Sequence, residues 1–154
     1  MENLVRRLGR MITPERTNPL PKPLPERTRR KMDRLGQALA AWKRQKGWRE
    51  PIRHLSEAAD RLGTDTVALH HYFKEREGMD FRTWRTRLRL EDAMQLLLEE
   101  PETAAADIGE RVGFSNRSNF SRQFLAYTGL TPVQWREKAR MSPDIQAPKN
   151  DYDD

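Results

Sequence analysis

The strongest constraint on the fold of this chain is an internal repeat at a spacing of 51 residues. The segments GMDFRTWR, from residue 78, and GLTPVQWR, from residue 129, share Gly, Trp and Arg at the same offsets. Further upstream the spacing is 50, so that Gly63 aligns with Gly113. The one-residue difference lies in a turn, where insertions are tolerated best. The pairs aligned at 51 are Asp65 with Asn116, Leu69 with Phe120, Phe73 with Phe124, Gly78 with Gly129, Trp84 with Trp135, and Arg85 with Arg136.

Each copy of the repeat predicts two helices joined by a tight turn. In the first copy, apolar residues recur at helical spacing from Leu55 to Leu62 and stop at Gly63. In the second copy, Phe120 and Phe124 stand four apart and therefore share one face of a helix. The rest of that helix holds Asn, Arg, Ser and Gln, although Ser and Asn form helices poorly. This pattern is typical of a helix-turn-helix, whose second helix presents hydrogen-bonding groups to the DNA major groove.

A long helix is predicted between the two copies. Residues 81–99 have apolar side chains at helical spacing and end before Pro101. Trp84, Leu88, Ala93 and Leu97 are expected to pack against both copies. A helix of this length spans roughly 28 Å, which is close to the ~34 Å rise of one DNA turn. The predicted fold is therefore all-α, with two helix-turn-helix units joined by a long central helix.

Proline and charge divide the rest of the chain. Residues 13–28 contain five prolines and little that could be buried, which predicts a stiff, extended linker. The first helix of the folded part is expected from Asp33 to Lys46, ending near Gly47. The predicted organisation is a basic, proline-rich linker (1–32), a folded domain (33–140) and a disordered acidic tail (141–154). Within the domain, the predicted parts are the first unit (33–77), the connecting helix (80–99) and the second unit (103–140).

The net charge of +6 is concentrated at the N-terminal end. Residues 1–50 carry 14 Lys or Arg against 5 Asp or Glu, residues 51–140 carry 14 against 14, and residues 141–154 carry 1 against 4. The basic segment is either a solvated linker or a segment attracted to phosphates or to an anionic membrane surface.

Several classes of protein are disfavoured by what the sequence lacks. The chain has no cysteine, which excludes disulfides and fits a cytoplasmic location. No apolar run approaches the roughly 18 residues of a membrane span, although LVRRLGRM would suit the cytoplasmic flank of a preceding span. His70 and His71 lie about 100° apart on a helix, whereas the two histidines of a helical zinc site stand four residues apart on one face. We therefore expect no metal, no cofactor, no small-molecule site and no enzymatic activity.

Three segments carry a resemblance to a known family. RLRLEDAMQLLLE, AADIGERVGFSNRSNFSRQFLAYTGLTPVQWR and HYFKEREGMDFRTW resemble the DNA-binding domain of the AraC/XylS family of bacterial transcription regulators, over residues 33–140. The resemblance implies about seven helices, with both recognition helices in adjacent segments of the major groove. Double-stranded DNA is the implied partner, RNA polymerase is a second candidate, and a sensor or membrane domain ahead of this module is a third.

The resemblance also implies which residues contact DNA. The base-facing positions fall on Val67, His70 and His71 in the first unit. In the second unit they fall on Ser118, Ser121 and Arg122, with Arg117 beside them. Lys74 and the N-terminal ends of both recognition helices are expected to contact phosphates.

Two questions stay open at the level of sequence. Arg85 and Arg136 either bond within their own unit or contact the phosphate backbone, whereas Trp84 and Trp135 are expected in the core. The balanced charge of residues 51–140 also leaves an alternative to DNA binding, a protein-interaction module that has kept the fold.

Overall fold

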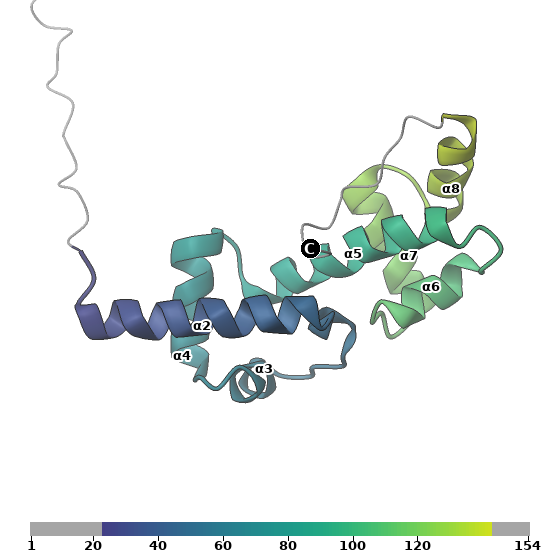
Figure 1. Cartoon of the computed structure of the whole chain (residues 1–154). Helices are drawn as coiled ribbons and strands as arrows, with labels where there is room; N and C mark the ends of the chain where they lie inside the picture. The colour runs from purple at the N-terminus through teal and green to yellow at the C-terminus, as the bar shows by residue number, and fades with distance from the viewer. Residues whose placement is uncertain (1–22, 143–154) are drawn as a thin grey trace, which may run out of the picture. The chain divides into compact units, whose positions relative to one another are not determined.

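The computed structural model describes residues 23–142, which form seven α-helices and no strand, as the sequence predicts. The chain divides into two compact parts, residues 1–30 and residues 31–154. The basic segment up to residue 22 and the acidic tail from residue 143 lie outside the described residues. The helices are α2 (Glu26–Arg44), α3 (Leu55–Arg61), α4 (Thr66–Tyr72), α5 (Phe81–Glu99), α6 (Ala105–Arg111), α7 (Arg117–Thr128) and α8 (Pro132–Met141), with two short helices, η1 (Gly47–Arg49) and η2 (Phe73–Glu77) (Figure 1).

The first helix begins earlier than the sequence analysis expects. It starts at Glu26, directly after Pro25, and not at Asp33, so residues 26–32 are helical and not part of a linker. Proline at the start of a helix loses no hydrogen bond, because the first backbone N–H groups have no partner within the helix. The apolar face also begins earlier, since Met32 is buried one turn before Leu35. The expected boundary was wrong because the first turns of the helix are polar and follow the prolines directly, so the apolar spacing does not mark them.

The two helix-turn-helix copies follow the repeat closely. Asp65 caps α4 by accepting a hydrogen bond from the backbone N–H of Ala68 at 2.8 Å, and Asn116 caps α7 by accepting one from Asn119 at 2.7 Å. Helix α4 continues into η2, so that the second helix of the first copy covers residues 66–77 and its counterpart covers residues 117–128. Left-handed glycines follow both helices, with φ of +65° at residue 78 and +78° at residue 129.

The copies differ in the last turns of their second helices. Helix α7 is α-helical throughout, whereas η2 has the wider π-helical winding. Nothing in the local sequence predicts this difference. π-Helical turns are rare and are often found at functional sites.

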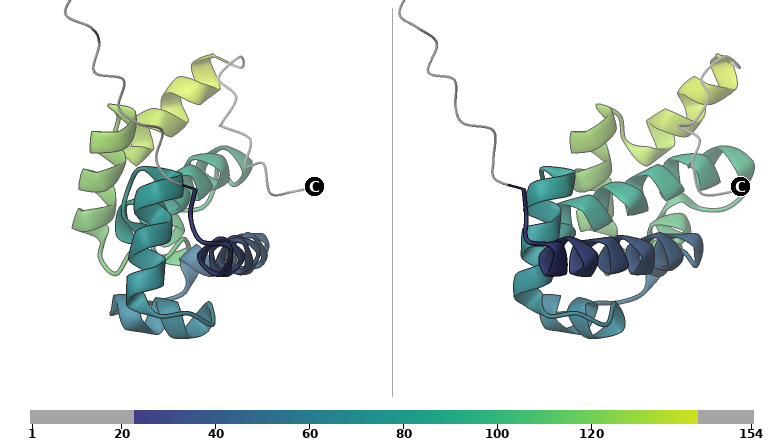
Figure 2. Two further views of the ribbon diagram at one scale, coloured as in Figure 1. Left: turned by 90° about the vertical axis from the view of Figure 1, so that its left-hand side faces the viewer. Right: turned by 60° about the vertical axis from the view of Figure 1, so that its left-hand side comes forward.

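Helix α5 belongs to two hydrophobic cores, as the sequence predicts. Its first half contributes Trp84 and Leu88 to a core with α2, α3 and α4, and its second half contributes Ala93 and Leu97 to a core with α6 and α7. The views in Figures 1 and 2 show α5 running from the first group of helices to the second. One continuous helix therefore connects both copies.

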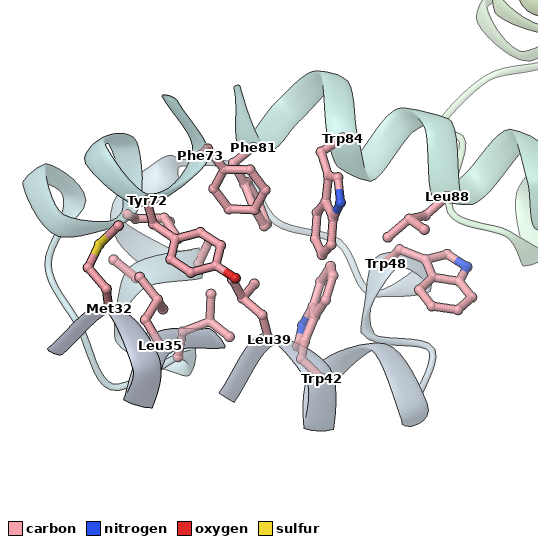
Figure 3. Packing of buried hydrophobic residues seen from close by; sticks show 14 residues of the cluster. Met32, Leu35, Leu39, Trp42, Trp48, Tyr72, Phe73, Phe81, Trp84 and Leu88 are labelled. Atoms are coloured by element: carbon pink, nitrogen blue, oxygen red, sulfur yellow. The ribbon is translucent and has the colours of Figure 1, made fainter. Parts of the chain in front are cut away.

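The first core is rich in aromatic side chains. Trp84 is 4% exposed and stacks on Trp42 of α2, with ring centroids 5.8 Å apart (Figure 3). Trp48 of η1 is almost fully buried in the same core, and Figure 3 shows it beside Leu88. The core position expected for Trp84 is confirmed. Trp135 is half-buried and packs against the second core.

A buried polar cluster ties η1 to the middle of α5. Asp92 is 3% exposed and accepts hydrogen bonds from Trp48 Nε1 at 2.8 Å and from Arg49 Nε and Nη2 at 2.6 and 2.7 Å. One turn away, the buried Arg89 donates to the carbonyl oxygens of Trp48 and Glu50. Sequence reasoning missed this cluster, because a charged side chain on an amphipathic helix is ordinarily exposed. The cluster therefore holds η1, which follows α2, against the middle of α5, between the residues of the first core and those of the second.

The two copies differ in side-chain volume at two buried positions, and the differences compensate each other. Gly109 of α6 aligns with Ala59 of α3, and Phe120 of α7 aligns with Leu69 of α4, all four being buried. A Cβ atom at Gly109 would lie 2.3 Å from Cδ1 of Phe120. The second copy therefore combines a smaller residue on its first helix with a larger one on its second.

We expect Gly109→Ala to lower the free energy of unfolding by about 1–3 kcal/mol, the usual effect of overpacking a core. Adding Phe120→Leu should recover part of this loss, because Leu leaves room for the methyl group, as in the first copy. Urea denaturation of both single variants and the double variant measures the coupling. Gly36→Ala in α2 is the control: its Cβ would approach only the hydroxyl end of Tyr72, at 3.3 Å, and no loss is expected. If the two changes in the free energy of unfolding were additive in the double variant, Gly109 and Phe120 would not compensate each other.

Candidate nucleic-acid interface

The sequence-predicted site residues of the first copy lie on the outer face of α4 and η2. Val67 is 77% exposed, His70 and Lys74 are exposed, and His71 is half-buried. The anchors Leu69 and Phe73 are 0% and 1% exposed. The helix thus separates a buried apolar face from an exposed face that combines Val, His and Lys.

The second copy repeats this division on α7. Ser118 and Arg122 are exposed and Ser121 is half-buried, at the positions equivalent to Val67, His71 and His70. Arg117, beside them, is also exposed. Within residues 23–142, neither Arg117 nor Arg122 forms an ion pair. Arg122 Nη2 lies 3.3 Å from Asn119 Oδ1, a weak contact that leaves its other donors free. Both guanidinium groups are therefore available to an anionic or hydrogen-bonding partner.

The N-terminal ends of the two recognition helices differ in charge. The backbone N–H of Ala68 and the ammonium group of Lys31, 2.9 Å away, lower the pKa of the Asp65 side chain, so the cap of α4 is a carboxylate. Asn116, the cap of α7, is neutral. A phosphate near the start of α4 would meet this negative charge, whereas the start of α7 presents its N–H groups without one. The phosphate contact expected at both helix ends is favoured by this geometry only at α7.

Arg136 bonds within its own copy, which answers one of the questions left open by the sequence. Its guanidinium group donates to the carbonyl oxygens of Leu97, Glu100 and Thr103 at 3.0, 3.1 and 2.6 Å. These carbonyls lie at the end of α5 and in the loop before α6, so Arg136 fixes that loop.

Arg85 holds the corresponding loop of the first copy less completely. Its Nη1 donates to the carbonyl oxygen of Ile52 at 3.3 Å, before α3, while its buried Nε has no hydrogen-bond partner. Burial lowers the pKa of Arg85, and the positive charge of Arg82 lowers it further.

Other kinds of site find little support in the described part of the chain. Residues 23–142 contain no group of three or more His, Asp or Glu side chains that could hold a metal ion. None of the helices in that range has both the length and the apolar character required to cross a bilayer.

The fold and the exposed faces together define a tandem helix-turn-helix protein. The family model described as a helix-turn-helix domain matches residues 58–138, more than half of the 154-residue chain. The chain belongs to the AraC/XylS family of helix-turn-helix transcription regulators, as its sequence resemblance predicts.

Two transcription regulators of similar sequence support this assignment. The chain is 38% identical over 82 residues to the transcriptional regulatory protein YesN of Bacillus subtilis, a match that covers 53% of this chain and 22% of YesN. It is 35% identical over 82 residues to the arabinose operon regulatory protein of Escherichia coli, covering 53% of this chain and 28% of that protein. The match thus spans about a quarter of the length of these relatives.

Solved structures share the fold. The C-terminal domain of the two-component response regulator yesN from Fusobacterium nucleatum is 28% identical, with a TM-score of 0.57, and the match covers 66% of this chain and 97% of that one. An AraC-type transcriptional regulator from Chromobacterium violaceum matches with a TM-score of 0.60 at 24% identity, covering 75% of this chain and 98% of that structure. At this identity the second match supports the fold alone.

Proposed function

We propose that this protein binds double-stranded DNA sequence-specifically and thereby regulates transcription, with α4 and α7 in successive segments of the major groove. The observation that carries the proposal is the equivalence of the two exposed faces. Positions 67, 70 and 71 on α4 correspond to positions 118, 121 and 122 on α7, while the anchors between them are buried. Two similar faces, on α4 and on α7, are joined by one connecting helix, α5. This arrangement suits a ligand whose surface repeats at regular intervals, as the DNA major groove does.

The side chains on these faces suit different parts of the DNA. Arg122 can donate two hydrogen bonds to guanine, and Ser118 and Ser121 can bond either bases or phosphates. In the first copy, His70 and His71 can hydrogen-bond to base edges, while Val67 can contact only a thymine methyl group. Lys74 and Arg117 are proposed to contact phosphates, which set the position of the protein on the duplex.

The wider setting is part of the same proposal. The matched relatives are several times longer than the matched segment, which supports a further domain, such as a sensor, as a partner of this module. RNA polymerase is a second proposed protein partner, because regulators of transcription act through it. A cytoplasmic location follows from the proposed function, since the chromosome of a bacterial cell lies there. No catalytic role is proposed.

Selection of duplexes from a random library, followed by gel shifts at two salt concentrations, tests the proposal. We expect a preferred sequence, with an affinity that falls steeply as salt rises, because phosphate contacts release counterions. No preferred sequence and no salt-dependent binding would contradict the proposal and would favour a protein-interaction module.

Arg122→Ala is expected to weaken binding to the selected duplex by about 1–3 kcal/mol and to relax the preference at one base pair. The reason is that Arg122 is exposed on the α7 face and its one side-chain contact is a long hydrogen bond to Asn119. Arg87→Ala serves as the control, because Arg87 lies on α5 in an ion pair with Glu91. If Arg122→Ala kept the parental ratio of affinities for selected and scrambled duplexes, Arg122 would have no role in base recognition.

A further inference from the structure

A cleft lined by arginines lies between α5 and α7. It has a volume of about 380 Å³, and its lining includes Arg53, Arg82, Arg85 and Arg89 but no carboxylate. Arg82, Arg85 and Arg89 come from α5 at spacings of three and four residues, so they follow one face of that helix. Arg53 comes from the loop before α3. The cleft therefore gathers four positive charges in one place.

The positive charges of these arginines repel one another in the protein without DNA. Burial lowers the pKa of Arg89 to about 10, and the positive charge of Arg85 contributes to the same shift. The pKa of Arg85 is in turn lowered by burial and by the charge of Arg82. Arg89 and Arg85 bond to backbone carbonyl oxygens, which satisfies donors but neutralises no charge.

The side chains of the two exposed arginines of the cleft, Arg53 and Arg82, have no bonded partner in the described part of the chain. Within residues 23–142, the side chains of Arg53 and Arg82 form neither a hydrogen bond nor an ion pair. Glu57 accepts a hydrogen bond from the backbone N–H of Arg53, which lowers its pKa most, but its side-chain ion pair is with Arg61. Asp80 caps α5 by accepting a hydrogen bond from the backbone N–H of Thr83. Arg53 and Arg82 are both exposed and can move toward an anion.

The position of Arg82 indicates which anion this is. In the cleft it lies with Asn119 and Gln123 of α7, and it also lines the neighbouring concavity with His70 of α4. Arg53 lines the same two concavities. These two arginines therefore occupy the surface between the two recognition helices. When two such helices enter successive major-groove segments, the sugar-phosphate backbone must cross the surface between them.

We infer that Arg53 and Arg82 bind the DNA backbone where it passes from one major-groove segment to the next. The inference rests on the proposed function and adds a third point of contact, which carries no base specificity. Phosphates in this cleft would neutralise positive charges that the nearby carboxylates of Glu57 and Asp80 balance only in part. They would also fix the register of both recognition helices on the duplex.

The test compares Arg82→Gln and Arg53→Gln with the parental protein, on a duplex that the parent selects from a random library and on a scrambled duplex. Each variant should bind both duplexes about 10-fold more weakly, the loss expected for one charge-assisted hydrogen bond. The slope of log K against log salt should become shallower by about one. Arg82→Lys, which keeps the charge, should keep the parental slope.

Arg87→Gln is the matched control, since it removes the same charge from the same helix but is paired with Glu91 and does not line the cleft. It should leave the slope unchanged. Parental affinity and slope in Arg82→Gln and Arg53→Gln would overturn the inference while leaving the proposed function intact. So would saturable binding of pyrophosphate to the DNA-free cleft, with DNA binding unaffected in these variants, because the cleft would then serve a small anion. A parental protein that binds no duplex would overturn the proposed function itself.

Discussion

Replacing Asp92 with Ala is expected to lower the free energy of unfolding by about 3–5 kcal/mol, the cost of removing one partner from a buried ion pair. Asp92 is 3% exposed, and its carboxylate accepts three side-chain hydrogen bonds, one from Trp48 and two from Arg49. Its loss removes an acceptor that serves a buried indole N–H and a partly buried guanidinium group. Urea denaturation followed by circular dichroism measures the change.

Two variants give this measurement its scale. Asp92→Asn keeps the shape and one acceptor oxygen, so its loss should be smaller than that of Asp92→Ala. Glu99→Ala removes an exposed carboxylate from the same helix, where it accepts one hydrogen bond from Gln95, and should change stability by less than about 0.5 kcal/mol. Equal stabilities of Asp92→Ala and Glu99→Ala would mean that the polar cluster does not stabilise the fold.

Inserting two alanines between Arg89 and Leu90 is expected to abolish specific DNA binding. Two residues turn everything beyond the insertion by about 200° around the α5 axis. The last α5 residue of the first core is Leu88 and the first of the second core is Leu90, so each core keeps its own residues. The helix content seen by circular dichroism should therefore remain close to parental, while the two recognition helices no longer face one duplex.

The insertion also separates Asp92 from Arg49, so Asp92→Ala is its proper control for binding. At a temperature where both variants are folded, Asp92→Ala should retain the preferred sequence and the insertion variant should not. Full affinity in the insertion variant would mean that one helix-turn-helix copy recognises the DNA and the other is structural.

Much of the fold could be predicted from the sequence because the repeat constrains it twice. The caps Asp65 and Asn116, the ends of the second helices and the core position of Trp84 each follow from local chemistry that recurs in the other copy. The two site faces follow in the same way, from exposed positions between buried anchors. Whether those faces contact DNA stays a prediction.

The parts that could not be predicted depend on contacts between distant segments. Asp92 and Arg89 are buried because Trp48 and Arg49 meet them from more than 40 residues away, and periodicity alone marks both as exposed. The arginine cleft likewise combines Arg53 with Arg82, which are far apart in sequence. The start of α2 was misplaced because its first turns are polar and follow prolines.

Hydroxyl-radical footprinting of the parental protein on its selected duplex tests the central claim, that both recognition helices act together on one DNA. The account predicts protection over two segments of the major groove on one face of the duplex, about 10 base pairs apart from centre to centre. The backbone between them should also be protected, and Arg82→Gln should reduce that protection. Protection of a single groove segment, with no second site one turn away, would contradict the claim.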